Sequence, residues 1–403
     1  MGEDDPRTRP CDRPMTAAAR TVDVVRVLFS STFGYGHVFP MLPLASAFRD
    51  AGHDVLWATS AQSTQQVAAA GLDTAAAGLS GSELRAGLAP LHAAAAEVPP
   101  PDRAAYMFPH MFGELLAPAM AADLLSLARE WRPDLLIHEH GELAAPLVGA
   151  VIGTPSVTHS FGGAIPAGIV RSAAQALGPL WAAHGLDVAP YAGCFAALYL
   201  DICPPTVQSV QTDHIPVVQP LRPVARVSQA DPGQDPPLVY LTLGTVQNHS
   251  PVLPVVAAAL CGLPVRVLVT VGPDGDPAAL GDLPDNVQVE RWVDQAEVLA
   301  RCSVVVSHAG SGTFLGALAA GRPQLCLPLA ADQFRNAEGG ARSGAALVLA
   351  PGQVTAASVA DAVTRLLVDD TFTRAARAVL AEMAAMPSPE VVVDVLASTF
   401  HPG

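Results

Sequence analysis

The sequence predicts an α/β fold of two domains, because short apolar runs alternate with helix-like segments in two separate series. Such alternation is typical of βαβ units, which build parallel sheets. The first series runs from residue 24 to residue 159, and the second begins at residue 238. Between them, residues 215–237 are rich in Pro, Gln and Asp, which is typical of a linker between domains.

Composition supports this organisation. A chain of 403 residues is long enough for two or three domains, each with a core. Half of the residues are hydrophobic and 15% are charged, which excludes a disordered chain. Residues 1–20 are polar without the apolar segment of a secretory signal, and no apolar run is long enough to span a bilayer. The six cysteines form no C-x-x-C pair, so we expect reduced thiols and a cytoplasmic location.

The charge pattern excludes several functions. The formal net charge is −15, and all 22 basic residues are arginines, since the chain contains no lysine. There is therefore no P-loop lysine, no kinase lysine and no lysine to hold pyridoxal phosphate. No basic patch indicates a nucleic-acid partner. To bind an anion, this acidic protein would depend on helix N-termini and backbone N–H groups.

We assign the elements of the first series from apolar pattern and turn residues. Strands are expected at residues 24–30, 54–59, 134–138 and 156–159, and helices at 38–50, 62–70 and 143–152. Residues 106–130 are expected to be mostly helical, with breaks or bends at Pro109 and Pro118. Residues 71–103 show no clear period, which indicates irregular structure or short helical pieces.

The second series continues in the same way. Strands are expected at residues 238–243, 265–271, 287–290, 303–307 and 322–328, and helices at 251–260, 313–320, 354–367 and 372–384. The last apolar segment, residues 389–400, is expected to pack against the body. Neither series contains a tandem repeat.

Two places carry residues suited to chemistry. Gly34, Gly36 and His37 follow the first strand, where the third glycine of a dinucleotide fingerprint is replaced by Phe39. His37 is either part of a tight turn or a general base, because its ordinary pKa lies near the working pH. After the strand at 303–307, small residues lead into a helix, and helix N-termini bind phosphate.

The stretch 303–336 resembles the nucleotide-sugar signature of GT-B glycosyltransferases of family 1, in the bacterial branch that decorates macrolides, anthracyclines and enediynes. The positions in the family's order and spacing are Trp292, Gln295, His308, Gly310, Gly312, Thr313, Pro328, Asp332, Gln333 and Asn336. The resemblance reaches back to the Gly34–His37 turn and so covers most of the chain. It implies two Rossmann-like domains that face each other across a cleft.

The resemblance also implies the domain layout. We expect a disordered tail over residues 1–21, an acceptor-binding domain over 22–214, a linker over 215–237 and a nucleotide-sugar-binding domain over 238–385. In the family, the terminal helix, here residues 386–403, crosses back to the first domain. The acceptor pocket is expected in the least periodic regions, residues 71–103 and 161–191.

The family's catalytic histidine falls on His37, and the aspartate that orients it falls on Glu139, which is longer by one methylene. Glu139 would hold the imidazole and stabilise the imidazolium. Glu142 is a rival for this role, or either residue is a surface glutamate. His138 and His140 suggest a metal site with His37 only weakly, because a His-x-His pair needs further ligands.

For the donor, the resemblance implies contacts from several loops. The expected donor-binding residues are Gly244, Thr245, Trp292, Val293, Gln295, His308, Gly310, Gly312, Thr313, Asp332 and Gln333. Of these, Trp292 would pack under the base, His308 would donate to a phosphate oxygen, and Asp332 with Gln333 would hold sugar hydroxyls. These roles depend on the family's spacing. Taken alone, a tryptophan is more often a core residue, and Asp332-Gln333 indicates only the start of a helix.

The nucleotide is suggested by Gly316. In plant members, a glutamate at this place binds both ribose hydroxyls of uridine, whereas glycine offers no side-chain acceptor. A 2′-deoxyribose leaves no donor unpaired there, which favours dTDP over UDP. The alternative is that Gly316 only permits close helix packing.

Together these points imply an inverting, metal-independent hexosyltransferase. It would move a deoxy sugar from a dTDP-sugar to a hydroxyl of a largely apolar aglycone, with no cofactor. Two alternatives stay open: a nucleotide-sugar epimerase or hydrolase of the same fold, and a non-catalytic binding or activating partner. A homodimer is also left open.

Overall fold

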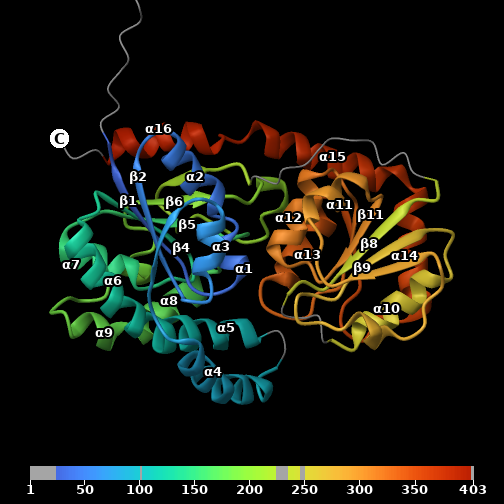
Figure 1. The fold of residues 1–403 in the computed structure, drawn as a ribbon, viewed down its shortest axis with the longest axis horizontal. Coiled ribbons are helices and arrows are strands. Elements are labelled where there is room, and N and C mark those ends of the chain that lie inside the picture. Colours follow the sequence, from blue (N-terminus) through green and yellow to red (C-terminus); the bar gives the residue numbers. More distant parts are fainter. Residues whose placement is uncertain (1–23, 100–101, 224–234, 246–249, 401–403) are drawn as a thin grey trace, which may run out of the picture.

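Two parallel sheets form the framework of the molecule, in a computed structural model that describes residues 24–99, 102–223, 235–245 and 250–400. They lie side by side with helices on their faces (Figure 1). This confirms the predicted α/β fold with two Rossmann-like domains. The tail expected over residues 1–21 lies outside the described residues.

The first sheet has seven strands in the order β3-β2-β1-β4-β5-β6-β7. The strands are β1 (Arg26–Ser30), β2 (Asp54–Thr59), β3 (Asp73–Ala76), β4 (Leu135–Glu139), β5 (Ser156–His159), β6 (Leu198–Asp201) and β7 (Val218–Pro220). Each pair is parallel, and β1 lies between β2 and β4. The chain order therefore reverses between β1 and β4, which is where open α/β sheets bind ligands.

Helices cover both faces of the first sheet. They are α1 (Tyr35–Val38), α2 (Leu42–Asp50), α3 (Thr64–Ala69), α4 (Gly81–Ala96), α5 (Arg103–Met107), the π-helix η2 (Phe108–Leu116), α6 (Ala117–Trp131), α7 (Ala145–Ile152), α8 (Ala167–Ala176), α9 (Gly178–Ala182) and the short 3₁₀ turns η3 (Pro190–Gly193) and η4 (Pro205–Val207). One core packs η2, α6, α7 and α8 against one face, and another packs α2 against the other.

The second sheet repeats this plan with six strands in the order β10-β9-β8-β11-β12-β13. The strands are β8 (Leu238–Thr242), β9 (Arg266–Thr270), β10 (Val287–Glu290), β11 (Val304–Ser307), β12 (Gln324–Cys326) and β13 (Ala346–Val348). Its chain order reverses between β8 and β11, which pair in parallel. The loops after these two strands carry Gly244 and His308.

The helices of the second half are α10 (Val252–Cys261), the 3₁₀ turn η5 (Pro277–Leu280), α11 (Gln295–Arg301), α12 (Ser311–Ala319), α13 (Gln333–Arg342), α14 (Ala356–Val368), α15 (Asp370–Ala385) and α16 (Pro389–Thr399). Helices α10 and α14 cover one face, while α11 and α12 cover the other.

The chain returns to the first half at its end. Helix α16 packs on α2, and Val392, Val393 and Leu396 are buried in the same core as Leu44 and Phe48. Arg222 fixes the crossing, because its backbone N–H donates to the Pro387 carbonyl at 2.8 Å. Figure 1 shows α15 and α16 running along one edge of both halves. The last helix of the chain is therefore part of the core of the first half.

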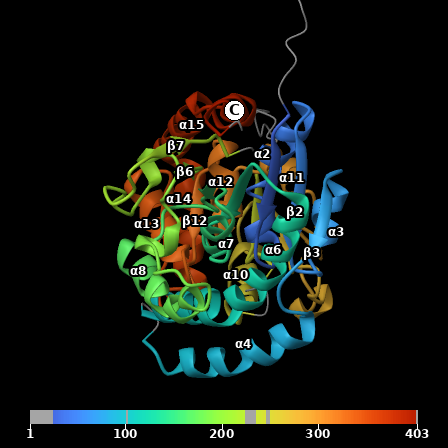
Figure 2. The ribbon, with the colours of Figure 1, turned by 90° about the vertical axis from the view of Figure 1, so that its left-hand side faces the viewer.

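The sequence missed several elements of the first half. The range 71–103 contains β3 and the 16-residue helix α4, whose capping box joins Ser80 and Glu83. The alanine-rich pattern of α4 has no strong apolar stripe, since most of the helix is exposed. Figure 2 shows α4 at the end of the molecule opposite to α15. Strand β7 extends the first sheet past residue 215, where the linker was expected to begin.

Residues 106–130 are helical as expected, and the stretch that begins beside Pro109 is a π-helix that continues directly into α6. Pro109 lies in the first turn of η2, and Pro118 lies in the first turn of α6, where a missing N–H costs little. The helical run Arg103–Trp131 is the one described segment long and apolar enough to cross a membrane, and half of its apolar window is buried inside the protein. That burial is typical of a core helix.

Candidate active site

His37 lies at the carboxyl end of the first sheet on the four-residue helix α1. The chain turns from β1 through Gly34, whose φ of 98° suits glycine, and the Gly34 N–H donates to Ser63 Oγ at 3.2 Å. Val38 is buried beneath the helix and fixes its inner face. The histidine ring lies between two phenyl rings, with centroids 5.6 Å from Phe112 and 5.0 Å from Phe161.

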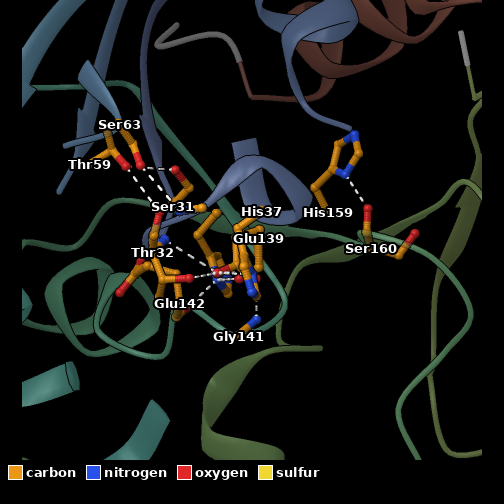
Figure 3. Close-up of polar contacts among 12 residues, drawn as sticks. Ser31, Thr32, His37, Thr59, Ser63, Glu139, Gly141, Glu142, His159 and Ser160 are labelled. Atoms are coloured by element: carbon orange, nitrogen blue, oxygen red, sulfur yellow. Dashed lines mark hydrogen bonds and ion pairs between the residues drawn. The ribbon is translucent and has the colours of Figure 1, made fainter. Parts of the chain in front are cut away.

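Glu139, the last residue of β4, is the side chain that faces His37. The imidazole Nδ1 is 3.0 Å from Glu139 Oε1, a contact with the geometry of an ion pair rather than an aligned hydrogen bond. Figure 3 shows the side chains of His37 and Glu139 next to each other. The Thr32 hydroxyl donates to the same oxygen at 2.7 Å, and the Gly141 N–H donates to Oε2.

The electrostatics of this pair are set by burial and mutual charge. Burial works to raise the pKa of Glu139, but His37, Thr32 and Gly141 lower it to about 2. Burial works to lower the pKa of His37, but Glu139 outweighs it and the pKa is raised from its ordinary value. Asp332 of the second half also raises it, so the two halves meet electrostatically at this histidine. The pair can hold a proton on the imidazole.

Glu142, the rival partner, has a different position. Its carboxylate accepts the N–H groups of Ala144 at 2.7 Å and Ala145 at 3.1 Å, at the start of α7. It is buried, which raises its pKa to about 7. The geometry therefore pairs His37 with Glu139 and gives Glu142 to a helix N-terminus.

His138 in β4 and His140 just after that strand have other partners. His138 Nδ1 lies 2.7 Å from the Glu142 carbonyl, and its Nε2 lies 2.9 Å from Thr158 Oγ1. Burial lowers the pKa of His138 to about 4 and that of His140 to about 3. Within the described ranges, no group of three or more His, Cys, Asp or Glu side chains is arranged to hold a metal ion.

An apolar cavity adjoins the His37 pair. It is lined from five directions by the loop after β1, the loop after β2, the β3–α4 region, η2 with α6, and the loop after β4. The lining residues are Thr32, Phe33, Ser60, Ala77, Gly78, Leu79, Leu84, Phe112, Leu116, Ala117, Met120, Gly141, Glu142 and Leu143. Part of it comes from residues 71–103, the irregular region that the sequence indicated for the acceptor.

In the second half, the first turn of α12 lies against the first half at Gly162. Gly310 is the N-cap and has no side chain to occupy the N–H groups of the first turn. Ala309 has a left-handed φ of 61°, and Asn336 Nδ2 donates to its carbonyl at 2.9 Å. A left-handed alanine is strained, and such strain gathers at functional sites. Gly162 of the first half packs so closely on Ser311 that a Cβ at 162 would lie 1.9 Å from Ser311 Oγ.

His308 directly follows β11, and its ring lies between two glycines. A Cβ at Gly244 would lie 2.7 Å from His308 Cε1, and one at Gly310 would lie 2.5 Å from its Nε2. His308 Nδ1 is buried without a hydrogen-bond partner among the described residues. Burial lowers the pKa of His308 to about 4, against a smaller effect of Asp332. The ring is therefore neutral and offers one N–H donor. Thr245 follows Gly244 and is partly exposed.

The predicted sugar-binding residues, Asp332 and Gln333, are each fixed by hydrogen bonds to other residues of the second half. Asp332 Oδ2 accepts from Ser311 Oγ at 2.6 Å and from Asn336 Nδ2 at 2.9 Å. Gln333 Oε1 accepts the N–H groups of Leu329 and Ala330, both at 2.8 Å. These bonds leave Asp332 Oδ1 and the Gln333 amide nitrogen as the groups available for a sugar.

The predicted base-binding residues separate into two environments. Trp292 is 52% exposed, which excludes a core role. Gln295 Nε2 donates to Thr313 Oγ1 at 3.0 Å, so the Thr313 hydroxyl faces α11. Val293 packs partly against the small core of α11 and α12. Gly316 is buried, and a Cβ there would lie 3.1 Å from Leu299 Cδ1. Close packing of α12 on α11 is therefore one reason for this glycine.

Residues that the sequence did not single out include Thr32, Phe112, Phe161, Ser311 and Gly162. All but Phe112 lie in loops or at a helix start near a strand terminus, and Phe112 lies in the middle of η2. Only the strand positions indicated where the loop residues would meet. Thr32 could have been found from its place directly after β1. The π-helix that carries Phe112 has no signal of its own in the sequence.

Comparison with known proteins places the chain in a family. The models of the erythromycin biosynthesis protein CIII-like family match residues 46–219 with their N-terminal domain and residues 256–398 with their C-terminal domain. The elloramycin glycosyltransferase ElmGT of Streptomyces olivaceus is 34% identical, over 93% of this chain and 98% of its own. The L-demethylnoviosyl transferase of Streptomyces niveus is 32% identical over the same shares.

Among solved structures, the glycosyltransferase VinC in complex with dTDP superposes with a TM-score of 0.77 at 27% identity, covering 94% of this chain and all of that one. Fold, sequence and domain models thus point to the same group of enzymes. Its members use a nucleotide sugar and a small-molecule aglycone as substrates. The chain belongs to the erythromycin biosynthesis protein CIII-like family of GT-B natural-product glycosyltransferases.

Proposed function

We propose that this glycosyltransferase transfers a deoxy sugar from a dTDP-sugar to a hydroxyl of a largely apolar aglycone, with inversion at the anomeric carbon. The observation that carries the proposal is the His37–Glu139 pair, held 3.0 Å apart opposite the free N-terminus of α12. A base in one half and an anion site in the other suit in-line displacement. Direct attack from the side opposite the leaving group inverts the anomeric carbon.

In this mechanism His37 takes the proton of the acceptor hydroxyl as its oxygen attacks the sugar. Glu139 stabilises the imidazolium that forms and fixes the ring orientation. Its own protonation is opposed by a pKa of about 2. The diphosphate leaves toward His308 and the N–H groups of α12, with Thr245 beside it. Preorganised donors of this kind stabilise a developing charge without reorganising.

The acceptor is proposed to lie in the apolar cavity beside His37. Leu84, Leu116 and Met120 give it an apolar wall, and Phe112 belongs both to this wall and to the histidine's surroundings. An apolar ring of the acceptor would pack against this wall while presenting one hydroxyl to His37 Nε2. An apolar wall with few polar groups is typical of the lining of small-molecule sites.

The small number of free hydrogen-bond acceptor atoms at Asp332 and Gln333 supports a sugar with few hydroxyls, that is, a deoxy sugar. Asp332 Oδ2 and Gln333 Oε1 are engaged by protein donors, which leaves few groups for sugar hydroxyls. The dTDP donor is supported by Gly316, which offers no acceptor to a ribose 2′-hydroxyl, and by the dTDP bound to VinC. A cytoplasmic location is supported by five free cysteines in the described part of the chain.

Two measurements test the proposal. Calorimetric titration should show tighter binding of dTDP than of UDP; equal affinity, or a preference for UDP, contradicts the nucleotide assignment. Any side chain at residue 316 would contact Leu299, so Gly316→Ala serves as a control for the effect on packing. Only Gly316→Glu should narrow the preference for dTDP over UDP.

A mass-spectrometric screen of dTDP-sugars against apolar hydroxylated aglycones should yield a glycoside with inverted anomeric configuration. Donor consumption that proceeds equally without any acceptor would instead indicate a hydrolase or epimerase.

A further inference from the structure

Helix α1 presents two different faces to the two halves of the molecule. Tyr35 and Phe39 are four residues apart and lie on one face, with ring centroids 5.1 Å apart. His37 lies between them in sequence and faces the other way, toward Glu139. Residues two apart on a helix do not face each other. The helix therefore separates an aromatic face from a catalytic one.

The aromatic face meets the second half at Trp292. The Tyr35 ring centroid lies 5.5 Å from that of the indole, at an interplanar angle of 36°. Trp292 is nevertheless 52% exposed, and Phe39 is 42% exposed. Exposed aromatic rings gathered across two domains are unusual on a soluble surface and commonly mark a binding site. The indole has contact with Tyr35 and still has free surface for a planar ligand.

Tyr35 and His37 are also mechanically linked. Helix α1 is only four residues long and is fixed by the Gly34–Ser63 hydrogen bond and by buried Val38. A displacement of the Tyr35 backbone would therefore displace His37. The contact between Tyr35 and Trp292 therefore connects the indole in the second half to the general base His37 in the first half, because His37 is only two residues from Tyr35 in the chain.

We infer that Tyr35 is a positioning residue for the donor: from the acceptor half, it holds the Trp292 indole in the orientation that stacks on the nucleobase. This inference rests on the proposed dTDP donor and on the base-binding role that the resemblance implies for Trp292. It adds that the base platform is completed by the acceptor-binding half. Base binding and the position of His37 are then coupled, so that the donor is recognised best when the two halves are in contact.

The test is calorimetric titration of dTDP into the full chain and its variants. Tyr35→Ala should weaken dTDP binding roughly two- to tenfold, the range expected for one aromatic pair. Tyr35→Phe keeps the ring and should bind as the wild type does. Phe39→Ala is the matched control. It removes an exposed aromatic ring from the same face of α1, but it leaves the contact between Tyr35 and Trp292 in place. Wild-type affinity in Tyr35→Ala would overturn the inference.

A double-mutant cycle shows whether the effect passes through Trp292. In a Trp292→Ala background, Tyr35→Ala should change dTDP affinity little; additive losses would mean that Tyr35 acts independently and would overturn the inference. If Trp292→Ala weakens binding and Tyr35→Ala does not, only the role of Tyr35 fails. If Trp292→Ala itself leaves dTDP affinity unchanged, the proposed base site fails and the inference fails with it.

Steady-state kinetics give a further readout that a merely structural contact would not move. With any productive donor and acceptor pair, Tyr35→Ala should raise KM for the dTDP-sugar more than KM for the acceptor. A rise confined to the acceptor KM would assign Tyr35 to the aglycone pocket and overturn the inference.

Discussion

The two halves place a histidine at the same edge of their sheets and give it opposite properties. His37, near the end of β1, is paired with Glu139, which holds its pKa above the ordinary value despite burial. His308, at the end of β11, lies between Gly244 and Gly310, and burial lowers its pKa to about 4. The difference shows that a histidine at the carboxyl edge of a parallel sheet can have either of two roles. It can accept a proton where a carboxylate faces the ring, and it is a neutral hydrogen-bond donor where none does.

The largest effect should come from removing the proton acceptor. His37→Ala should lower kcat by about 10²–10⁴-fold, the usual contribution of a general base, while dTDP affinity stays within about twofold. Single-turnover rates with an alcohol acceptor and calorimetry with dTDP measure the two quantities. His110→Ala is a suitable control, since His110 also contacts a glutamate but lies on the exposed side of η2. Nearly full activity in His37→Ala would refute its role as base.

Replacing His308 should affect nucleotide binding as well as the rate. His308→Ala removes one N–H donor to a diphosphate, and hydrogen bonds to charged groups are worth about 1.5–3 kcal/mol, roughly 10- to 100-fold in affinity. We therefore expect a weaker dTDP complex together with a slower reaction, unlike His37→Ala. If both variants lose only kcat and bind dTDP equally well, the two histidines do not have the separate roles that their surroundings indicate.

Glu139→Gln should sharpen the comparison by making His37 more like His308. Without the carboxylate, burial is no longer outweighed and the pKa of His37 falls. The acid limb of the kcat/KM profile reports deprotonation of the base, so it should move to lower pH while the maximum rate drops, though by less than in His37→Ala. An unchanged acid limb would show that Glu139 does not set the titration of His37.

Much of this comparison was visible in the sequence, and the missing part has a physical reason. His37, His308 and Glu139 lie at strand ends that valine- and leucine-rich runs made evident, and the resemblance supplied their roles. Strand β6, the edge strand β7 and helix α4 were missed, since β6 and β7 are short and α4 is alanine-rich and mostly exposed. Contacts between halves, such as Gly162 on Ser311, depend on domain packing that no local pattern records.

Glu142 tests whether the choice of Glu139 was correct. Glu142→Gln should leave the acid limb of the rate profile in place, because its carboxylate faces the start of α7 rather than His37. A larger loss of rate than in Glu139→Gln would mean that the partner is misassigned. The effect of Glu142→Gln should instead appear in the free energy of unfolding.

The pH dependence of that stability has a definite sign. Burial raises the pKa of Glu142 from 4.5 to about 7, so between these values the folded state binds more protons than the unfolded state. The contribution of Glu142 to the free energy of unfolding therefore falls as pH rises from about 4.5 to about 7. Glutamine does not titrate, so the stability of Glu142→Gln relative to the wild type should increase over this window. Urea unfolding at pH 5 and pH 8 measures the change; a constant difference would contradict it.

The smallest effect should come from removing divalent ions. The second half offers the leaving diphosphate the N–H groups at the start of α12 and the neutral donor His308, and the first half brings Gly162 against the same turn. A helix N-terminus carries about half a positive charge, and its N–H groups need no metal to bind phosphate oxygens. Turnover in excess chelator should therefore equal turnover in magnesium within about twofold. If chelation abolishes activity and magnesium restores it, the charge is carried by an ion, and His308 would have to be reassigned from phosphate donor to a supporting position.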